Sequence, residues 1–150
     1  DLKISAGNET YALGRLESCV FHLNEQKIGL LTDIDMPEAM ASDQKIPLGP
    51  FARLKRNLSE MEYVYTHTVW YSDLDKSHHM ANHRYVTLME NVFSPDFFTR
   101  NELKELEIHY ISQGFYGDEI RLYKKESETG YLITGARSDG TIVFTGCMIF

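Results

Sequence analysis

Residues 71–85 read YSDLDKSHHMANHRY, and this stretch places two carboxylates and three histidines at the junction between two structural elements. The residues that lead into it, EYVYTHTVWY at 62–71, are rich in aromatic and β-branched side chains, which predicts a strand. Beyond it, apolar residues recur at helical spacing over 85–93, and the Ser-Pro pair at 94–95 predicts the end of that helix. The polar cluster therefore lies in a turn and in the first turn of a helix.

The start of the expected helix gives this junction its chemistry. The first N–H groups of a helix lack intrahelical acceptors and lie at the positive end of its dipole, so they can hold an anion or a developing oxyanion. We expect these groups near residues 81–83. The junction thus offers a carboxylate, an imidazole and an oxyanion-binding group together, and it is the expected reaction site.

The rest of the C-terminal sequence predicts four further strands, at 103–112, 118–125, 131–138 and 141–150. Short turns separate them, and the Asp-Gly pair at 139–140 predicts a type I′ hairpin because this pair tolerates positive φ angles. A strand, one apolar helix and an antiparallel meander make an α+β plan. We expect the sheet to wrap around the helix.

These segments resemble those of a known family, the acyl-acyl-carrier-protein thioesterases. From residue 62 to 150 the chain is similar to the C-terminal hotdog domain of these enzymes, in which W/Y-S-D-L-D-x-N-x-H-x-x-N-x-x-Y opens the central helix. A second stretch, IHYISQGFYGDEI at 108–120, resembles the family's strand, crossing and Gly-Asp turn. The resemblance implies a hotdog fold, with an antiparallel sheet wrapped around a central helix. It also implies a thioesterase of fatty acid biosynthesis that hydrolyses fatty acyl-acyl-carrier protein to free fatty acid and carrier protein.

The N-terminal part predicts a strand, a turn and a strand over 1–24, a short helical piece at 37–41 and a linker at 43–50. In the family two hotdog repeats run in tandem, and this part resembles the end of the first. The expected division is a partial first hotdog repeat at 1–41, a linker at 42–60 and a second hotdog domain at 61–150. Hotdog sheets commonly pair edge to edge, and an incomplete repeat leaves an exposed strand edge, so we expect a homodimer or a longer parent chain.

The resemblance implies catalytic roles at four positions. Asp75 matches the second aspartate of the motif, where a carboxylate can activate water or attack the thioester carbonyl. His79 falls at the family's catalytic histidine and can exchange a proton or stabilise the tetrahedral intermediate. Ser77 stands where plant members carry Asn, and Gln113 with Gly114 stands where they carry a Glu-Cys pair. A hydroxyl still forms hydrogen bonds and a Gln amide can orient a water, but the amide cannot act as a base.

The acyl chain is expected along the apolar face of the helix. The expected substrate contacts are Asn82, Tyr85, Met89 and Phe93. The alternative for the apolar residues is ordinary core, which a stripe at helical spacing usually indicates. Asn82 can instead cap the helix, and so can Asp75.

A metal site is an alternative for the three residues Asp75, His79 and His83, which stand four apart. Asp75 precedes the expected helix, however, and neither HExxH nor CxxC is present. We therefore expect no metal and no cofactor. Asp73 is expected to serve a turn or a cap, and His78 and His83 are expected on the surface.

Composition limits the partners. A net charge of −7 argues against nucleic acid, which requires a basic face. No run approaches the roughly 20 apolar residues of a membrane span, and the isolated Cys19 and Cys147 are typical of free thiols, so a soluble, cytoplasmic protein without membrane contact is expected. An acidic carrier protein would need a local basic patch. The candidates are Arg53, Lys55 and Arg56, or Arg100 and Lys104.

Two other functions remain open. Hotdog enzymes that act on coenzyme A also place an Asp at the head of this helix, so an acyl-CoA thioesterase is one alternative. The other is a noncatalytic acyl-binding or assembly module, which Ser77, Gln113 and the incomplete first repeat favour. Turnover of acyl-carrier and acyl-CoA thioesters, measured side by side, separates the three.

Overall fold

The computed structural model describes residues 1–22, 24–25, 27–35 and 46–150 of the 150-residue chain. The chain divides into two compact units, 1–50 and 51–150, which are described separately. The short helix expected at 37–41 and the first residues of the expected linker lie outside the described residues.

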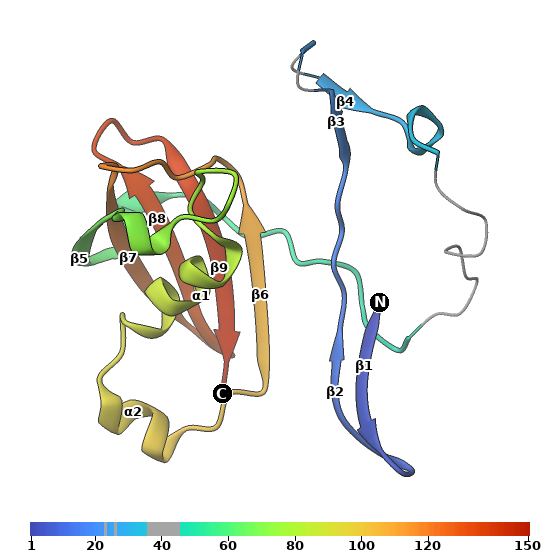
Figure 1. Cartoon of the computed structure of the whole chain (residues 1–150). Coiled ribbons are helices and arrows are strands. Elements are labelled where there is room, and N and C mark those ends of the chain that lie inside the picture. Colours follow the sequence, from blue (N-terminus) through green and yellow to red (C-terminus); the bar gives the residue numbers. More distant parts are fainter. Residues whose placement is uncertain (23, 26, 36–45) are drawn as a thin grey trace. The chain divides into compact units, whose positions relative to one another are not determined.

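The C-terminal unit is built on one five-stranded antiparallel sheet with the strand order β5-β7-β8-β9-β6 (Figure 1). The strands are β5 (Glu62–Thr68), β6 (Glu105–Tyr110), β7 (Glu119–Ser127), β8 (Gly130–Arg137) and β9 (Ile142–Ile149). Each of them overlaps a strand that the sequence predicts. The meander β7-β8-β9 forms the centre of the sheet, with β5 and β6 at its edges. The α+β plan is confirmed.

The helical part is shorter and more divided than the sequence predicts. Helix α1 (Asn82–Glu90) ends before Phe93, and a second helix, α2 (Pro95–Arg100), follows it. Proline is favoured at the first position of a helix, because an N–H there would lack an intrahelical acceptor. The Ser-Pro pair therefore separates two helices rather than ending the helical region. None of the described helices combines the length and the apolar character that a membrane crossing requires.

The core forms where α1 packs on the sheet (Figure 1). Leu88 and Met89 of the helix are 3% and 0% exposed, and they share one cluster with Ile133 of β8 and Phe144 of β9. Burying each such side chain stabilises the fold by about 1.5–3 kcal/mol. Gly146 on β9 permits the close approach, because a Cβ there would lie 2.5 Å from Met89 Cε.

The turn between β8 and β9 has the expected position but not the expected type. Gly140 has a φ of +86°, whereas Asp139 does not have a positive φ. A type I′ turn requires positive φ at both central residues, so that prediction is wrong. The N–H of Gly140 donates to the carbonyl of Arg137 at 3.0 Å, and the turn ends on a left-handed glycine, as in a type I turn with a bulge.

The N-terminal unit contains two hairpins where the sequence predicts one. Strands β1 (Leu2–Ala6) and β2 (Glu9–Gly14) pair across a tight turn in which Gly7 has a φ of +58°. Strand β3 (Val20–His22) pairs instead with β4 (Lys27–Gly29). The glycine at position 7 places the first turn early, because it adopts positive φ without steric cost. Short 3₁₀ helices occur at Leu31–Asp33 in this unit and at Leu58–Glu60 and Tyr71–Asp73 in the other.

Candidate active site

The segment between β5 and α1 folds into a small hairpin of its own. Leu74 and Met80 pair as an isolated antiparallel bridge, and the N–H of Asp75 donates to the carbonyl of His79 at 2.8 Å. His78 completes the turn with a φ of +61°, in the left-handed region that residues other than glycine seldom adopt. Its N–H donates to the carbonyl of Asp75 at 3.0 Å, so hydrogen bonds hold this conformation in place. His78 itself is exposed, as expected.

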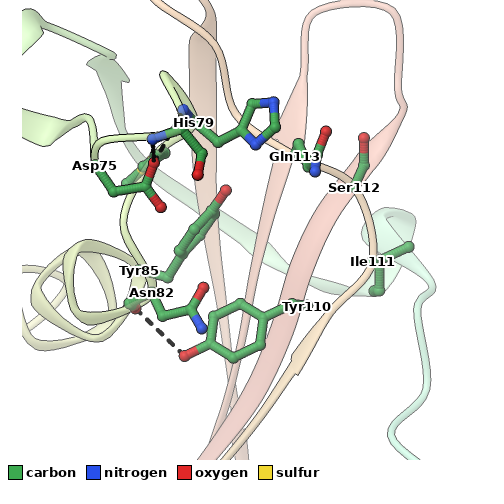
Figure 2. Close-up of a pocket in the computed structure, with 10 residues that line it drawn as sticks. Asp75, His79, Asn82, Tyr85, Tyr110, Ile111, Ser112 and Gln113 are labelled. Carbon is green, nitrogen blue, oxygen red and sulfur yellow. Dashed lines mark hydrogen bonds between the residues drawn. The ribbon is translucent and has the colours of Figure 1, made fainter. Parts of the chain in front are cut away.

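The carboxylate of Asp75 is oriented by this hairpin and caps no helix. Its Oδ1 accepts hydrogen bonds from the N–H of Ser77 at 2.7 Å and of His79 at 3.4 Å. Ala81, not Asp75 or Asn82, occupies the N-cap position of α1, and Asn82 is the first helical residue. Figure 2 shows the second carboxylate oxygen of Asp75 turned away from these N–H groups. That oxygen is oriented to accept a proton or to attack an electrophile.

A pocket of about 310 Å³ opens beside the hairpin. Its walls come from the hairpin, from the start of α1, and from the end of β6 with the residues that follow. The lining residues are Asp75, Ser77, His79, Met80, Asn82, Tyr85, Tyr110, Ile111, Ser112 and Gln113. The structure thus gathers the four expected catalytic residues and two of the four expected substrate contacts around one cavity (Figure 2).

Both His79, from the hairpin, and Gln113, from the segment after β6, line this pocket (Figure 2). The ring of His79 packs edge-on against Phe115, with centroids 5.2 Å apart and an angle of 88° between the planes. This contact holds the imidazole against the segment that carries Gln113. An imidazole and a side-chain amide in one cavity can together orient a water, and only the imidazole can transfer its proton.

Tyr85 is a buried aromatic residue of the pocket wall. Its ring lies edge-on to Tyr110 and to Phe144, each with a centroid distance of 5.4 Å. Its hydroxyl accepts a hydrogen bond from the N–H of Gly114 at 2.9 Å. Burial raises the pKa of Tyr85 above its ordinary value, so this phenol stays neutral at physiological pH.

Four lining residues are absent from the sequence prediction: Met80, Tyr110, Ile111 and Ser112. Tyr110 contacts the first turn of α1, where its hydroxyl donates to the carbonyl of Asn82 at 3.3 Å. The sequence signal that could have found three of them is their position at the end of a predicted strand, directly before Gln113.

Gly114 explains one departure from the family motif. A Cβ at this position would lie 3.1 Å from the Cβ of Met80 and 3.2 Å from the hydroxyl oxygen of Tyr85, which is tighter than ordinary van der Waals contact. The carbonyl of Gly114 also accepts the N–H of Met80 at 2.8 Å. The cysteine that plant members carry here would therefore require Met80 or Tyr85 to shift.

The backbone N–H groups at the start of α1 are only partly available. The N–H of Ala81 donates to the carbonyl of Asp73 at 2.9 Å, which removes it from the expected oxyanion-binding group. In the described part of the chain no acceptor is found for the N–H groups of Asn82 and His83. Of these two residues only Asn82 lines the pocket, so an oxyanion site at this helix is limited to its N–H.

Asp73 has a structural role, as expected. It is 6% exposed, its Oδ2 accepts the N–H of Trp70 at 2.8 Å, and Nε2 of His67 lies 2.9 Å from the same oxygen. Nε of Arg84 lies 3.4 Å from Oδ1. Burial alone would raise the pKa of Asp73, but these donors outweigh burial and hold the pKa below its ordinary value. The carboxylate anchors the 3₁₀ turn from which the hairpin starts.

Two expected substrate contacts lie outside this pocket. Met89 is fully buried in the core, and Phe93 belongs to an aromatic cluster that also contains Phe97, Tyr131 and Phe150. The apolar stripe of α1 therefore packs mainly as core, the alternative considered for it. Phe93 also borders a separate hollow of about 250 Å³.

The three residues considered for a metal do not share a helix face. Asp75 and His79 precede α1, whereas His83 is exposed and does not line the pocket. Among the described residues no group of three or more His, Cys, Asp or Glu side chains is arranged to hold a metal ion.

Comparison with solved structures shows which fold this arrangement belongs to. An acyl-ACP thioesterase from Bacteroides thetaiotaomicron matches with a TM-score of 0.73 and 23% identity, over 87% of this chain and 52% of that chain. A Staphylococcus aureus protein in complex with CoA matches with a TM-score of 0.51 and 19% identity, over 60% of this chain and 79% of that chain. Both likenesses show the hotdog fold expected from the sequence. This chain spans about half the length of the Bacteroides enzyme.

Sequence comparison identifies the family. No curated protein matches the sequence. The acyl-ACP thioesterase C-terminal domain matches residues 57–143, a span that contains the hairpin, α1 and every residue that lines the pocket. With more than half of its residues matched by that domain, the chain belongs to the acyl-ACP thioesterase family.

Proposed function

We propose that this chain carries the catalytic site of a thioesterase that hydrolyses fatty acyl-acyl-carrier protein to free fatty acid and carrier protein. The observation that carries the proposal is the pocket, which gathers Asp75, Ser77, His79 and Gln113 beside the start of α1. A carboxylate, an imidazole and a backbone N–H at the start of a helix, here that of Asn82, are groups that acyl transfer to water uses. Membership of the family supports the same reaction.

The proposed reaction begins with the thioester carbonyl oxygen facing the N–H of Asn82, a residue of the pocket lining. Gln113 holds a water, whose oxygen attacks the carbonyl carbon while its proton passes to Asp75. The N–H of Asn82 stabilises the oxyanion of the tetrahedral intermediate, and a single donor of this kind contributes about 10²–10³ in rate. When the C–S bond breaks, the sulfur takes a proton from His79, which regains one from Asp75. Direct attack by the Asp75 carboxylate is the covalent variant of the same chemistry.

The N–H groups of Ser77 and His79 support this assignment of Asp75. They hold Oδ1 through two hydrogen bonds, which restrict rotation of the side chain and favour one direction for the second oxygen. Placing a reacting group in this way converts a bimolecular encounter into a positioned step. Ser77 thus assists through its backbone as well as through its hydroxyl.

An acyl-CoA thioesterase is the second candidate, because the Staphylococcus aureus protein of the same fold is in complex with CoA. Both substrates present a thioester on a phosphopantetheine arm, and the pocket described here would receive that shared part. We propose the carrier-protein thioester first because the family that matches residues 57–143 is named for it.

The test compares wild type with Asp75→Asn on acyl-carrier and acyl-CoA thioesters side by side. We expect Asp75→Asn to lower kcat by about 100-fold or more with the fold intact, since general base catalysis contributes about 10²–10⁴. Glu128→Gln, which removes an exposed carboxylate from the β7–β8 turn, is the matched control and should leave kcat unchanged.

The outcomes separate the candidates. Faster turnover of the carrier-protein substrate supports the first, and faster turnover of acyl-CoA supports the second. An unchanged kcat in folded Asp75→Asn removes Asp75 from the mechanism. Binding of acyl groups without turnover of either thioester would identify a noncatalytic acyl-binding module.

A further inference from the structure

Arg137, at the end of β8, does not line the pocket but donates hydrogen bonds to two residues that do, Ser112 and Gln113. Its Nε donates to Oδ2 of Asp118 at 2.9 Å, and its Nη1 donates to Oγ of Ser112 at 3.1 Å. Its Nη2 donates to the backbone carbonyl of Gln113. One guanidinium thus binds the segment 112–118 at three places.

These contacts use the particular shape of arginine. The guanidinium is planar and presents its donors in a fixed fork, so three acceptors bound at once lock both the side chain and the backbone it holds. Asp118 compensates the positive charge and also accepts the N–H of Phe115 at 3.0 Å. Hydrogen bonds therefore connect Arg137 to both ends of the segment from Ser112 to Asp118.

The pocket side of the same segment is held by two backbone contacts. The N–H of Gly114 donates to the hydroxyl of Tyr85 at 2.9 Å, and the carbonyl of Gly114 accepts the N–H of Met80 at 2.8 Å. Gln113 lies between these contacts and those of Arg137. Arg137 binds the carbonyl of Gln113, and Tyr85 and Met80 bind the backbone of Gly114. The backbone is therefore held on both sides of the Gln113 side chain.

We propose that Arg137 is a positioning residue for the reaction: by binding the carbonyl of Gln113 and the hydroxyl of Ser112, it aims the Gln113 amide at the attacking water. This inference rests on the proposed thioesterase function. Arg137 touches neither substrate nor water and acts through Gln113. Misplacement of a reacting group by about 1 Å can cost about 100-fold in rate, so loss of the three hydrogen bonds should be visible in kcat.

The experiment compares Arg137→Met, Arg137→Lys and the control Arg121→Met in the full chain. Arg137→Met removes all three hydrogen bonds, and Arg137→Lys keeps the charge but not the fork. Arg121 is an exposed arginine of β7 outside the pocket lining, and its replacement should change nothing. We expect Arg137→Met to lower kcat by about 10- to 100-fold with KM changed by less than about twofold, and Arg137→Lys to restore part of kcat.

A double-mutant cycle distinguishes positioning from general support of the fold. If Arg137 acts through Gln113, Arg137→Met should change kcat by less than about twofold in a Gln113→Ala background. An equal loss of kcat in both backgrounds, or an unchanged kcat in folded Arg137→Met, overturns the proposal.

Amide hydrogen exchange supplies a readout that does not depend on turnover. Exchange over residues 112–118 should be faster in Arg137→Met than in wild type and in Arg121→Met. If wild type hydrolyses no thioester, the proposed function fails, and the exchange rates alone decide whether Arg137 holds Gln113. Equal exchange over 112–118 in Arg137→Met and wild type overturns the inference in that case as well.

Discussion

In the pocket, Gln113 presents an amide where plant members of the family carry a carboxylate. We predict that Gln113→Glu raises kcat by about tenfold or broadens the pH range of activity, because a titratable group next to the water can share in removing its proton. The measurement is a pH–rate profile of kcat from about pH 5 to 9. Thr129→Glu adds the same charge in the β7–β8 turn and serves as the control. Identical profiles for Gln113→Glu and wild type would mean that this side chain takes no part in the chemistry.

Asp73 links the stability of the site to pH. Its pKa is held below the ordinary value by the N–H of Trp70, by His67 and by Arg84, so its charged form stabilises the fold at any pH above the unfolded pKa of about 4. That contribution is lost as the pH falls through the lower pKa of the folded state. Protonated wild type and Asp73→Asn should then have similar stabilities.

We therefore predict that Asp73→Asn lowers the free energy of unfolding by about 3 kcal/mol at pH 7, since it removes the charged acceptor that binds the N–H of Trp70, the half-buried ring of His67 and the half-buried Arg84. The difference from wild type should shrink below about pH 4. Urea unfolding at several pH values measures it, with the exposed Asp96→Asn as control. A difference that is independent of pH from neutrality down to about pH 3 would show that the Asp73 charge does not carry this stability.

Among the elements, the strands were the most predictable part of the fold. Alternation of side chains and turn residues locates β7 and β8 to within about two residues, because both signals are local. The helices were less predictable. Pro95 carries the same local preference whether it ends one helix or starts another, and only the packing of Phe97 and Phe93 in the aromatic cluster selects a second helix. The β8–β9 turn type likewise depends on whether Asp139 adopts positive φ, which the Asp-Gly pair permits but does not require.

The site shows the same division between local and tertiary information. Asp75 and His79 follow from one motif, and the local hairpin brings both to the pocket. Tyr110 and Ser112 reach the pocket because β6 pairs with β9 and the chain then crosses back toward α1, and the sequence marks them only by their place directly before Gln113. Arg137 is harder still to predict from the sequence, because it acts through hydrogen bonds to a segment that lies 19 to 25 residues away.

At the scale of the whole molecule, the described residues of the N-terminal unit include no buried hydrophobic side chain. Its strands form two-stranded hairpins, and several of its large apolar side chains are exposed: Leu2 by 66%, Ile4 by 65% and Ile28 by 71%. Isolated hairpins of this kind are marginally stable in water. We propose that the unit is the end of a preceding hotdog repeat, and that these side chains are buried against the 61–150 domain or against a second chain.

If the hairpins are buried in this way, deletion of residues 1–43 should lower the melting temperature of the remaining domain or cause it to aggregate, because an apolar surface would then face water. Ile4→Thr with Ile28→Thr tests the same burial in the full chain. If both side chains are buried in the assembled protein, this double variant should be destabilised by about 2 kcal/mol or more, whereas Ser5→Thr, at a neighbouring position of β1, should change the melting temperature little. Differential scanning calorimetry measures the melting temperature, and light scattering measures the molar mass of each variant. A deletion variant that stays monomeric, soluble and as stable as the full chain would mean that the hairpins cover nothing, and the partial-repeat interpretation of residues 1–41 would then be wrong.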